Sequence, residues 1–183
     1  MLSLVPFQTP SDIDLRISAQ LQLGERSLIL FYLLEGQWDS LSFPQTAKTP
    51  GFQDELWKTT CFEIFLQRAG ELDYQEWNFS PSGNYAHYHF LKYRERTVDV
   101  PPQKLQSPII IDKQDQIWKL KVEIPWETVG SSRLTEKWNY SLAAVTHDKI
   151  KNERHYWALT HAGPKPDFHD ARSFTGSLEI RSS

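Results

Sequence analysis

Residues 13–23 alternate apolar and polar side chains along their whole length. A repeat of two is the pattern of a β-strand that buries one face, because successive side chains of a strand point to opposite sides. Gly24 and Glu25 form a predicted turn, after which residues 27–36 are expected to return as a second strand. Further strands are predicted at residues 58–67, 74–81, 84–93, 116–125, 138–148 and 173–180.

Turn residues separate these segments at intervals of about ten residues, which is typical of a β-sandwich or a β-barrel. The one helical element that the sequence predicts is a single turn at residues 125–127, with Pro125 at its first position. The chain has 183 residues, a length that favours one domain over two. We therefore expect an all-β fold, namely a single antiparallel, jelly-roll-like β-sandwich domain over residues 1–183.

The composition narrows the classes of function. The net charge is −3 and the 20 Lys and Arg residues are scattered, so no nucleic-acid-binding face is predicted. Residues 28–34 form the longest apolar run, which is too short to cross a bilayer, and the N-terminal segment lacks the basic region of a signal peptide. Cys61 is the one cysteine, so no disulfide can form within the chain. A cytoplasmic location without a membrane partner is expected, although a secreted bacterial protein cut from a longer precursor would share these features.

The order of the predicted strands resembles the DOMON-like superfamily, the β-sandwich group that includes the family 9 carbohydrate-binding modules. The better signatures are the hairpin with the F-x-x-x-G spacing from Phe79 to Gly83 and the V-E-I-P-W step at residues 122–126. Residues 156–174 also resemble a bacterial subgroup of DOMON-like proteins without an assigned reaction. The matching segments are GQWDSLSF (36–43), DELWKTTCFEIFL (54–66), YQEWNFSPSGNYAHY (74–88), WKLKVEIPW (118–126), NYSLAAVTHDKIKNERHYWAL (139–159) and SFTGSLEI (173–180).

The resemblance implies a ligand-binding sandwich, for which relatives provide both sugar and haem as precedents. In the haem-binding relatives a methionine commonly ligates the iron, whereas the single methionine of this chain is Met1. His87 and His89 share one face of a predicted strand and cannot ligate opposite sides of one iron. Haem is therefore not expected, and no other cofactor is predicted.

Sugar recognition needs flat aromatic faces for the C–H side of a pyranose ring and planar polar groups for its hydroxyls. Trp57 is the predicted stacking residue, because its neighbours, including Lys58, are polar. Glu63 lies on the second face of a strand that is apolar on both sides, so it is expected to line a concave face of the sheet. An exposed glutamate without a role is the alternative. Trp77, next to Asn78, is a second candidate aromatic residue, with core packing as its alternative.

Residues 155–174 hold three histidines together with several charged and aromatic side chains. Pro164 and Pro166 are expected to stiffen this segment, since proline fixes φ and lowers the entropy lost on ordering. Phe168 is expected to anchor it to the sandwich, so that it forms a lid and a polar rim over a ligand. The predicted rim residues are His161, Lys165, Asp167, His169 and Arg172.

The leading hypothesis is a non-catalytic module that binds a small polar ligand, with a saccharide as the first choice. One alternative is an enzyme of unassigned reaction that uses Asp167, His169 and Glu63. A metal site at Asp167 and His169, with His161 or Glu63, is a weaker possibility. A protein-interaction module with a flat apolar surface is a further alternative. The predicted ligand-binding residues are Trp57, Lys58, Glu63, Trp77, Asn78, His161, Lys165, Asp167, His169 and Arg172.

Overall fold

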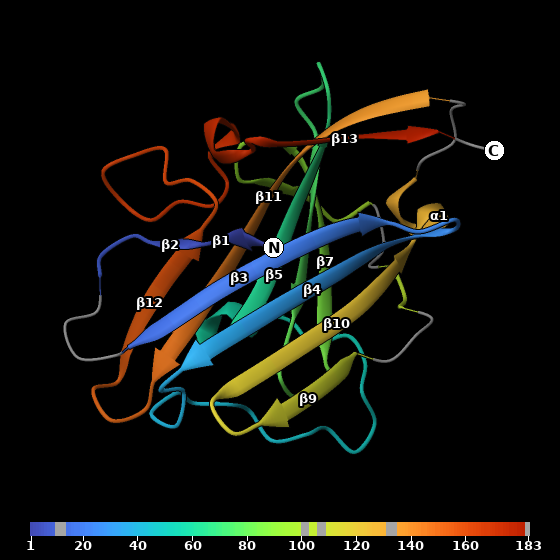
Figure 1. The fold of residues 1–183 in the computed structure, drawn as a ribbon. Helices are drawn as coiled ribbons and strands as arrows, with labels where there is room; N and C mark the ends of the chain where they lie inside the picture. Colours follow the sequence, from blue (N-terminus) through green and yellow to red (C-terminus); the bar gives the residue numbers. More distant parts are fainter. Residues whose placement is uncertain (10–13, 100–102, 106–108, 131–134, 182–183) are drawn as a thin grey trace.

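The computed structural model describes residues 1–9, 14–99, 103–105, 109–130 and 135–181. Two antiparallel sheets lie face to face, and the strands of sheet A cross in front of those of sheet B in Figure 1. Sheet A has the order β1-β3-β4-β10-β9, and sheet B has the order β2-β12-β11-β5-β6-β7-β8, with β13 paired to β11. The expected all-β sandwich fold is confirmed. Among the described residues, no helix is long and apolar enough to cross a membrane.

The bounds of the strands follow from the sheet pairings. Sheet A consists of β1 (Leu2–Ser3), β3 (Leu15–Leu23), β4 (Ser27–Gly36), β10 (Ile117–Pro125) and β9 (Ile110–Gln114). Sheet B consists of β2 (Val5–Pro6), β12 (Glu153–Ala158), β11 (Thr135–Asp148), β5 (Cys61–Arg68), β6 (Tyr74–Phe79), β7 (Tyr85–Lys92), β8 (Glu95–Thr97) and β13 (Gly176–Arg181). The helical elements are η1 (Leu56–Lys58), α1 (Trp126–Val129) and η2 (Ala171–Ser173).

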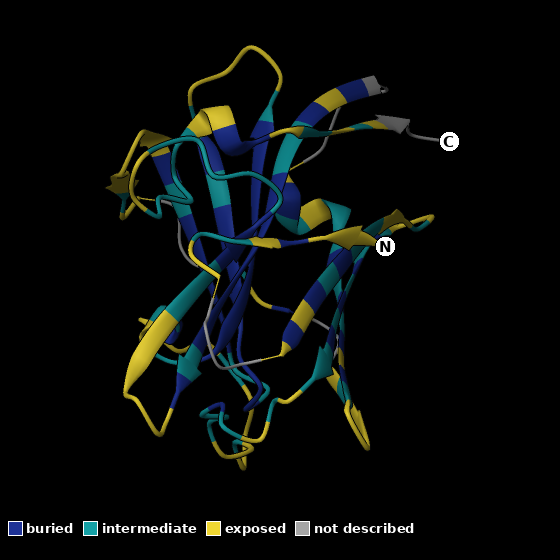
Figure 2. Cartoon of the chain, turned by 60° about the vertical axis from the view of Figure 1, so that its left-hand side comes forward, coloured by how far each residue is buried: buried dark blue, intermediate teal, exposed yellow. Residues whose placement is uncertain are grey.

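The main core lies between the two sheets and is built from the alternating apolar residues of each strand. Buried and less buried residues follow each other along β3, β4 and β10, as the colours in Figure 2 show. Three large side chains fill its centre, Trp77 from β6, Trp118 from β10 and Trp138 from β11. Phe62 stacks on Trp118 with 5.0 Å between the ring centroids, which joins the two sheets.

Sheet B is buried on its second face as well. There Cys61 and Phe65 of β5 belong to a separate apolar cluster with Tyr74, Tyr88 and Phe174. The segment between β12 and β13 lies over this face, since Phe168 and Phe174 pack against Phe65. All seven residues of β5 from Cys61 to Gln67 are therefore buried, which explains why the sequence of this strand is apolar on both sides.

Most predicted strands match the observed ones, and β4 matches residue for residue. Pro125 ends β10 and caps the single helical turn α1, so the predicted helical turn begins one residue later than expected. The segment 155–174 is not one loop, because its first four residues belong to β12. The strand predicted at 173–180 begins only at Gly176, because residues 173–175 precede β13. Ile13, predicted in the first strand, lies outside the described residues.

Candidate functional site

A pocket of about 330 Å³ opens on the outer face of sheet B, the face that looks away from sheet A. Seven helical and strand elements contribute to it, namely η1, β5, β6, β7, β8, β11 and β12. The β7–β8 turn and the segment after β12 complete the lining. The volume lies at the lower end of the range of about 300–1,000 Å³ that is usual for small-molecule sites. The lining residues are Trp57, Glu63, Glu76, Tyr88, Phe90, Arg94, Arg96, Val145, Arg154, Tyr156, Pro166, Phe168 and His169.

Two carboxyl groups form the floor of the pocket. Glu63 on β5 is 3% exposed, and Glu76 on β6 is 4% exposed. The register pairs Glu63 with Asn78 across the two strands, which places Glu63 and Glu76 on the same face as diagonal neighbours. The Cys61 thiol donates to Glu63 Oε1 at 3.1 Å, and the Asn78 amide donates to Glu76 Oε1 at 2.8 Å.

Burial changes how these carboxyl groups titrate. Burial, followed by the nearby Glu76 carboxyl, raises the pKa of Glu63 to about 8. Burial also raises the pKa of Glu76 to about 7, although the Asn78 hydrogen bond and the positive charges of Arg94 and Arg96 act in the opposite direction. The pair therefore retains a proton at neutral pH and carries less than two negative charges.

His169 is held over the floor by a chain of hydrogen bonds. The backbone N–H of Arg94 donates to the Tyr74 hydroxyl at 3.1 Å, and this hydroxyl lies 2.8 Å from His169 Nδ1, where the tautomer of the imidazole sets which atom donates. His169 Nε2 faces Glu76 Oε2 at 3.7 Å. Burial lowers the pKa of His169 to about 4, so the ring is neutral at physiological pH.

Asp167 fixes the segment after β12 above the pocket. The Tyr93 hydroxyl donates to Asp167 Oδ2 at 2.6 Å, and Arg94 Nη2 donates to Asp167 Oδ1 at 2.8 Å. These contacts lower the pKa of Asp167 even though partial burial opposes the change. The side chain therefore ties the segment to the β7–β8 turn.

Aromatic rings form the walls. Trp57 contacts Tyr88 edge to face at 5.7 Å between centroids, and Tyr156 contacts Phe168 in the same way at 6.0 Å. The Arg96 guanidinium lies 4.2 Å above the Tyr88 ring and 3.7 Å from Asp54, which also accepts a hydrogen bond from the Tyr88 hydroxyl. The pocket thus combines apolar ring faces, buried oxygen acceptors and guanidinium donors.

Three of the ten predicted site residues line this pocket: Trp57, Glu63 and His169. Glu63 lies on the second face of its strand, as the alternation predicts. Asp167 supports the pocket through Arg94 without lining it. Whether any of them contacts a ligand stays a prediction.

The structure corrects the expectation for Trp77. This side chain has no exposed surface and packs in the core between the sheets, because residues 76 and 77 of one strand point to opposite faces. Its neighbour Asn78 is on the pocket side of sheet B but lies below the pocket, where it orients Glu76. A role for Trp77 in stacking on a ligand is therefore wrong.

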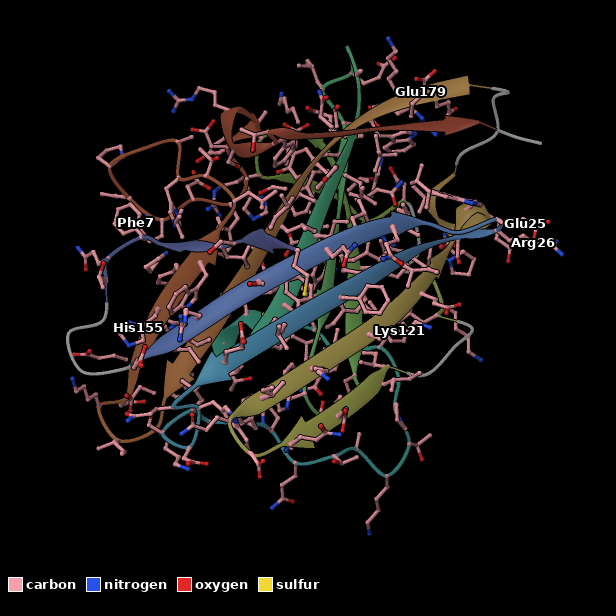
Figure 3. All side chains as sticks on the ribbon, in the orientation of Figure 1. Phe7, Glu25, Arg26, Lys121, His155 and Glu179 are labelled. Atoms are coloured by element: carbon pink, nitrogen blue, oxygen red, sulfur yellow. The ribbon has the colours of Figure 1, made fainter. Side chains whose placement is uncertain are left out.

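Four further predicted site residues do not line the pocket. Lys58 pairs with Glu55 on the surface, and Arg172 pairs with Asp170. His161 binds the backbone carbonyl of Val5 at 2.9 Å and packs edge-on against Phe7, which Figure 3 labels beside this segment. Lys165 is exposed and does not line the pocket. The proline-rich part of the segment thus contributes Pro166 and Phe168 to the site rather than a ring of polar groups.

The sequence interpretation missed Glu76, Tyr88, Tyr156 and the arginines. Glu76 and Tyr88 could have been found, because strand alternation places them on the face that Glu63 occupies once the strands are paired. Tyr156 belongs to β12 rather than to the predicted loop 155–174, and Arg154 precedes that loop on the same strand. No sequence pattern predicts Arg94 at the site, because it lies in a turn and the conformation of that turn places it at the pocket.

The arrangement of the His, Cys, Asp and Glu side chains bears on the metal and haem alternatives. Within the described residues, no group of three or more His, Cys, Asp or Glu side chains lies close enough to hold a metal ion. His87 accepts a hydrogen bond from the Gln103 backbone, and His89 lies 3.2 Å from Asp73, so both rings already have protein partners.

Comparison with known proteins shows the fold. No protein-family model matches the chain, and a search of curated proteins found no match. A "putative carbohydrate-binding protein" from Bacteroides uniformis ATCC 8492 is similar over 97% of this chain and 84% of its own, with a TM-score of 0.68 and 15% identity. A family 9 carbohydrate-binding module from Caldicellulosiruptor kristjanssonii, in complex with glucose, is similar over 100% of this chain and 85% of its own, with a TM-score of 0.51 and 9% identity.

A family 9 carbohydrate-binding module from the same organism, in complex with cellotriose, is similar over 100% of this chain and 84% of its own, with a TM-score of 0.51 and 10% identity. At these identities the likeness shows a shared β-sandwich fold of the carbohydrate-binding-module type. The wider DOMON-like assignment and a bacterial origin stay predictions.

Proposed function

We propose that this protein binds a saccharide in the pocket on the outer face of sheet B. The observation that carries the proposal is the combination of aromatic walls with two buried carboxyl groups in one cavity. Trp57 and Tyr156 offer faces for the C–H side of a sugar ring. Glu63 and Glu76 accept hydrogen bonds from hydroxyls, while Arg94 and Arg96 donate to ring and hydroxyl oxygens. The sandwich neighbours crystallised with glucose and cellotriose add support at the level of fold.

Calorimetric titration with glucose and cellotriose tests the proposal. Trp57→Ala and Tyr156→Ala are each expected to weaken binding about tenfold or more, which corresponds to a loss of about 1.4 kcal/mol. Lys58→Ala and Arg172→Ala serve as controls, because each residue is close in sequence to a residue that lines the pocket but does not line the pocket itself. Unchanged affinity in Trp57→Ala would contradict the proposed site.

A thermal-shift screen extends the search to other sugars. A ligand that binds only the folded state at a hundred times its Kd adds about 2.7 kcal/mol to the unfolding free energy. If the protein is cytoplasmic, as the sequence predicts, sugar phosphates, nucleotide sugars and cell-wall precursors belong in the screen beside the neutral saccharides. Absence of a shift with every sugar would argue against saccharide binding.

Catalysis is the second candidate, favoured by one observation. Glu63, with a pKa of about 8, lines the same pocket as His169, and displaced pKa values gather at catalytic sites. Asp167, the third residue of that hypothesis, is held by Tyr93 and Arg94 and does not line the cavity. Release of reducing sugar from oligosaccharides, lost in Glu63→Gln, would establish catalysis. The interaction-module alternative predicted a flat apolar surface, whereas this face is hollowed.

A further inference from the structure

Glu63 differs from Glu76 in what surrounds its carboxyl group. The positive charges of Arg94 and Arg96 interact favourably with the Glu76 carboxylate, whose Oε2 lies 3.7 Å from His169 Nε2. Among the described residues, one side-chain hydrogen bond reaches the Glu63 carboxyl group, from the neutral Cys61 thiol at 3.1 Å. In the described part of the chain, no Lys, Arg or His lies within ion-pair distance of Glu63. The floor of the pocket therefore holds a buried carboxyl group without a cation.

The arginines of the pocket do not supply that cation. Arg94 binds Asp167 at 2.8 Å, and Arg96 lies 3.7 Å from Asp54 while its guanidinium rests on the Tyr88 ring. Arg154 is on the exposed part of β12. Charged side chains at the rim interact weakly through solvent, whereas a carboxylate at the floor is desolvated and interacts strongly with any charge that enters.

The rings around the floor suit a cation as well as a sugar face. Trp57, Tyr88 and Tyr156 line the same cavity as Glu63. The faces of such rings carry negative potential and attract ammonium groups, most strongly where water is excluded. An ammonium bound here would meet aromatic faces at its sides and a carboxylate below it.

We propose that the pocket selects saccharides that carry a free primary ammonium group, and that Glu63 is the residue that binds this group. The proposal rests on the saccharide-binding function proposed above and names the ligand class. At neutral pH the unliganded Glu63 is protonated, so a neutral hydroxyl forms an ordinary hydrogen bond with a neutral carboxyl group. An ammonium favours the ionised carboxylate and donates up to three hydrogen bonds, so it forms a charge-assisted contact that a hydroxyl does not form.

Ligand binding of this kind must release protons near neutral pH. A positive charge beside Glu63 favours its ionised form, and burial has raised the pKa of Glu63 to about 8, so the bound proton leaves when the ammonium enters. A neutral sugar produces no comparable release. The other titratable or charged groups that face this floor include Cys61, Tyr74, Glu76, Tyr88, Arg94, Arg96, Arg154, Tyr156 and His169.

The test is calorimetric titration of the whole chain at pH 7 with glucose, glucosamine and N-acetylglucosamine. These probes differ at one substituent, which is a hydroxyl, an ammonium or a neutral amide. The expected result is that glucosamine binds at least tenfold more tightly than both neutral probes. Repeating the titration in two buffers of different ionisation enthalpy is expected to reveal proton release with glucosamine alone.

Two variants assign the selectivity to a residue. Glu63→Gln is expected to remove the preference, so that glucosamine binds no more tightly than glucose, and Glu123→Gln, which removes a partly exposed carboxylate on sheet A, is expected to keep the preference. Equal affinity of the wild type for glucose and glucosamine overturns the inference but leaves saccharide binding standing. Failure of all three sugars to bind overturns both. If Glu63→Gln does not fold, the wild-type series and its proton release still decide the matter.

Discussion

The outer faces of the two sheets differ in chemistry more than in shape. The outer face of sheet A carries the larger hollow, about 460 Å³, yet its polar residues, such as Gln22, Lys119 and Asp112, are exposed. The hollow on sheet B is smaller, about 330 Å³, and holds two carboxyl groups that are almost fully buried. Hydrated charges on sheet A interact weakly with a ligand, whereas desolvated carboxyl groups interact strongly. Buried polar groups, rather than volume, therefore locate the candidate site.

The largest expected effect is a loss of stability, and it distinguishes a core residue of sheet B from a pocket residue of the same sheet. Trp77→Ala is expected to lower the unfolding free energy by about 3–5 kcal/mol, since it empties a fully buried core position. Trp57→Ala, at a partly exposed position in the pocket, is expected to cost much less stability while it weakens sugar binding. Chemical denaturation of both variants measures the contrast. Equal stability losses would place Trp57 in the core and remove it from the site.

The pH dependence of stability tests the buried carboxyl groups. Their pKa values in the folded protein, about 8 for Glu63 and about 7 for Glu76, exceed the ordinary value of 4.5, so the folded state binds protons that the unfolded state has released. Stability must then fall as pH rises from about 6.5 to 8, by up to about 1.4 kcal/mol per pH unit for each proton. His169 and His87, with pKa values lowered to about 4, act in the opposite direction only below pH 6.5.

Denaturation curves at pH 6.5, 7 and 8 measure this slope. Glu63→Gln is expected to flatten this slope, and Glu123→Gln, which removes a partly exposed carboxyl group on sheet A, is expected to keep it. A wild-type stability that does not change over this range would mean that the two carboxyl groups are hydrated like those of sheet A.

A smaller loss of stability is expected for Asp167, which ties the segment after β12 to the β7–β8 turn. Asp167→Asn removes the ion pair with Arg94, whose side chain is half exposed, so the stability loss is expected to be only about 0.5–1 kcal/mol. Faster hydrogen exchange in residues 159–170 and weaker sugar binding are expected to accompany it. Asp170→Asn, which removes a second surface pair in the same segment, is the control. An unchanged exchange rate would show that Asp167 does not hold this segment in place.

The smallest effect is expected on sheet A. Lys121→Gln changes a residue of the larger hollow, which Figure 3 labels on the outer face of β10, and removes its pair with Glu123. Stability is expected to change by less than about 0.5 kcal/mol, with sugar binding unchanged. Loss of sugar binding in this variant, measured by titration, would move the site to sheet A.

Local pattern was sufficient for much of the fold. The apolar run after the Gly24–Glu25 turn identified β4 to the residue. Alternation predicted that Glu63 faces away from the core, because successive side chains of a strand point to opposite sides. The same rule excludes Trp77 and Asn78 from a shared face, so that part of the predicted site could have been corrected from sequence. The placement of β12 needed its partner, since Glu153–Ala158 pairs with the second half of β11.

The sequence by itself determined the fold class, most of the long strands and the side of each such strand on which a residue lies, since strand patterns and turn residues are local features of the chain. Tertiary structure alone decided which outer face holds buried carboxyl groups in its pocket. Residues from Trp57 to His169 meet there because the segment after β12 lies over sheet B. That covering desolvates Glu63 and Glu76 and so sets their pKa values. Desolvation depends on what surrounds a group in space, and neighbours in sequence do not specify it.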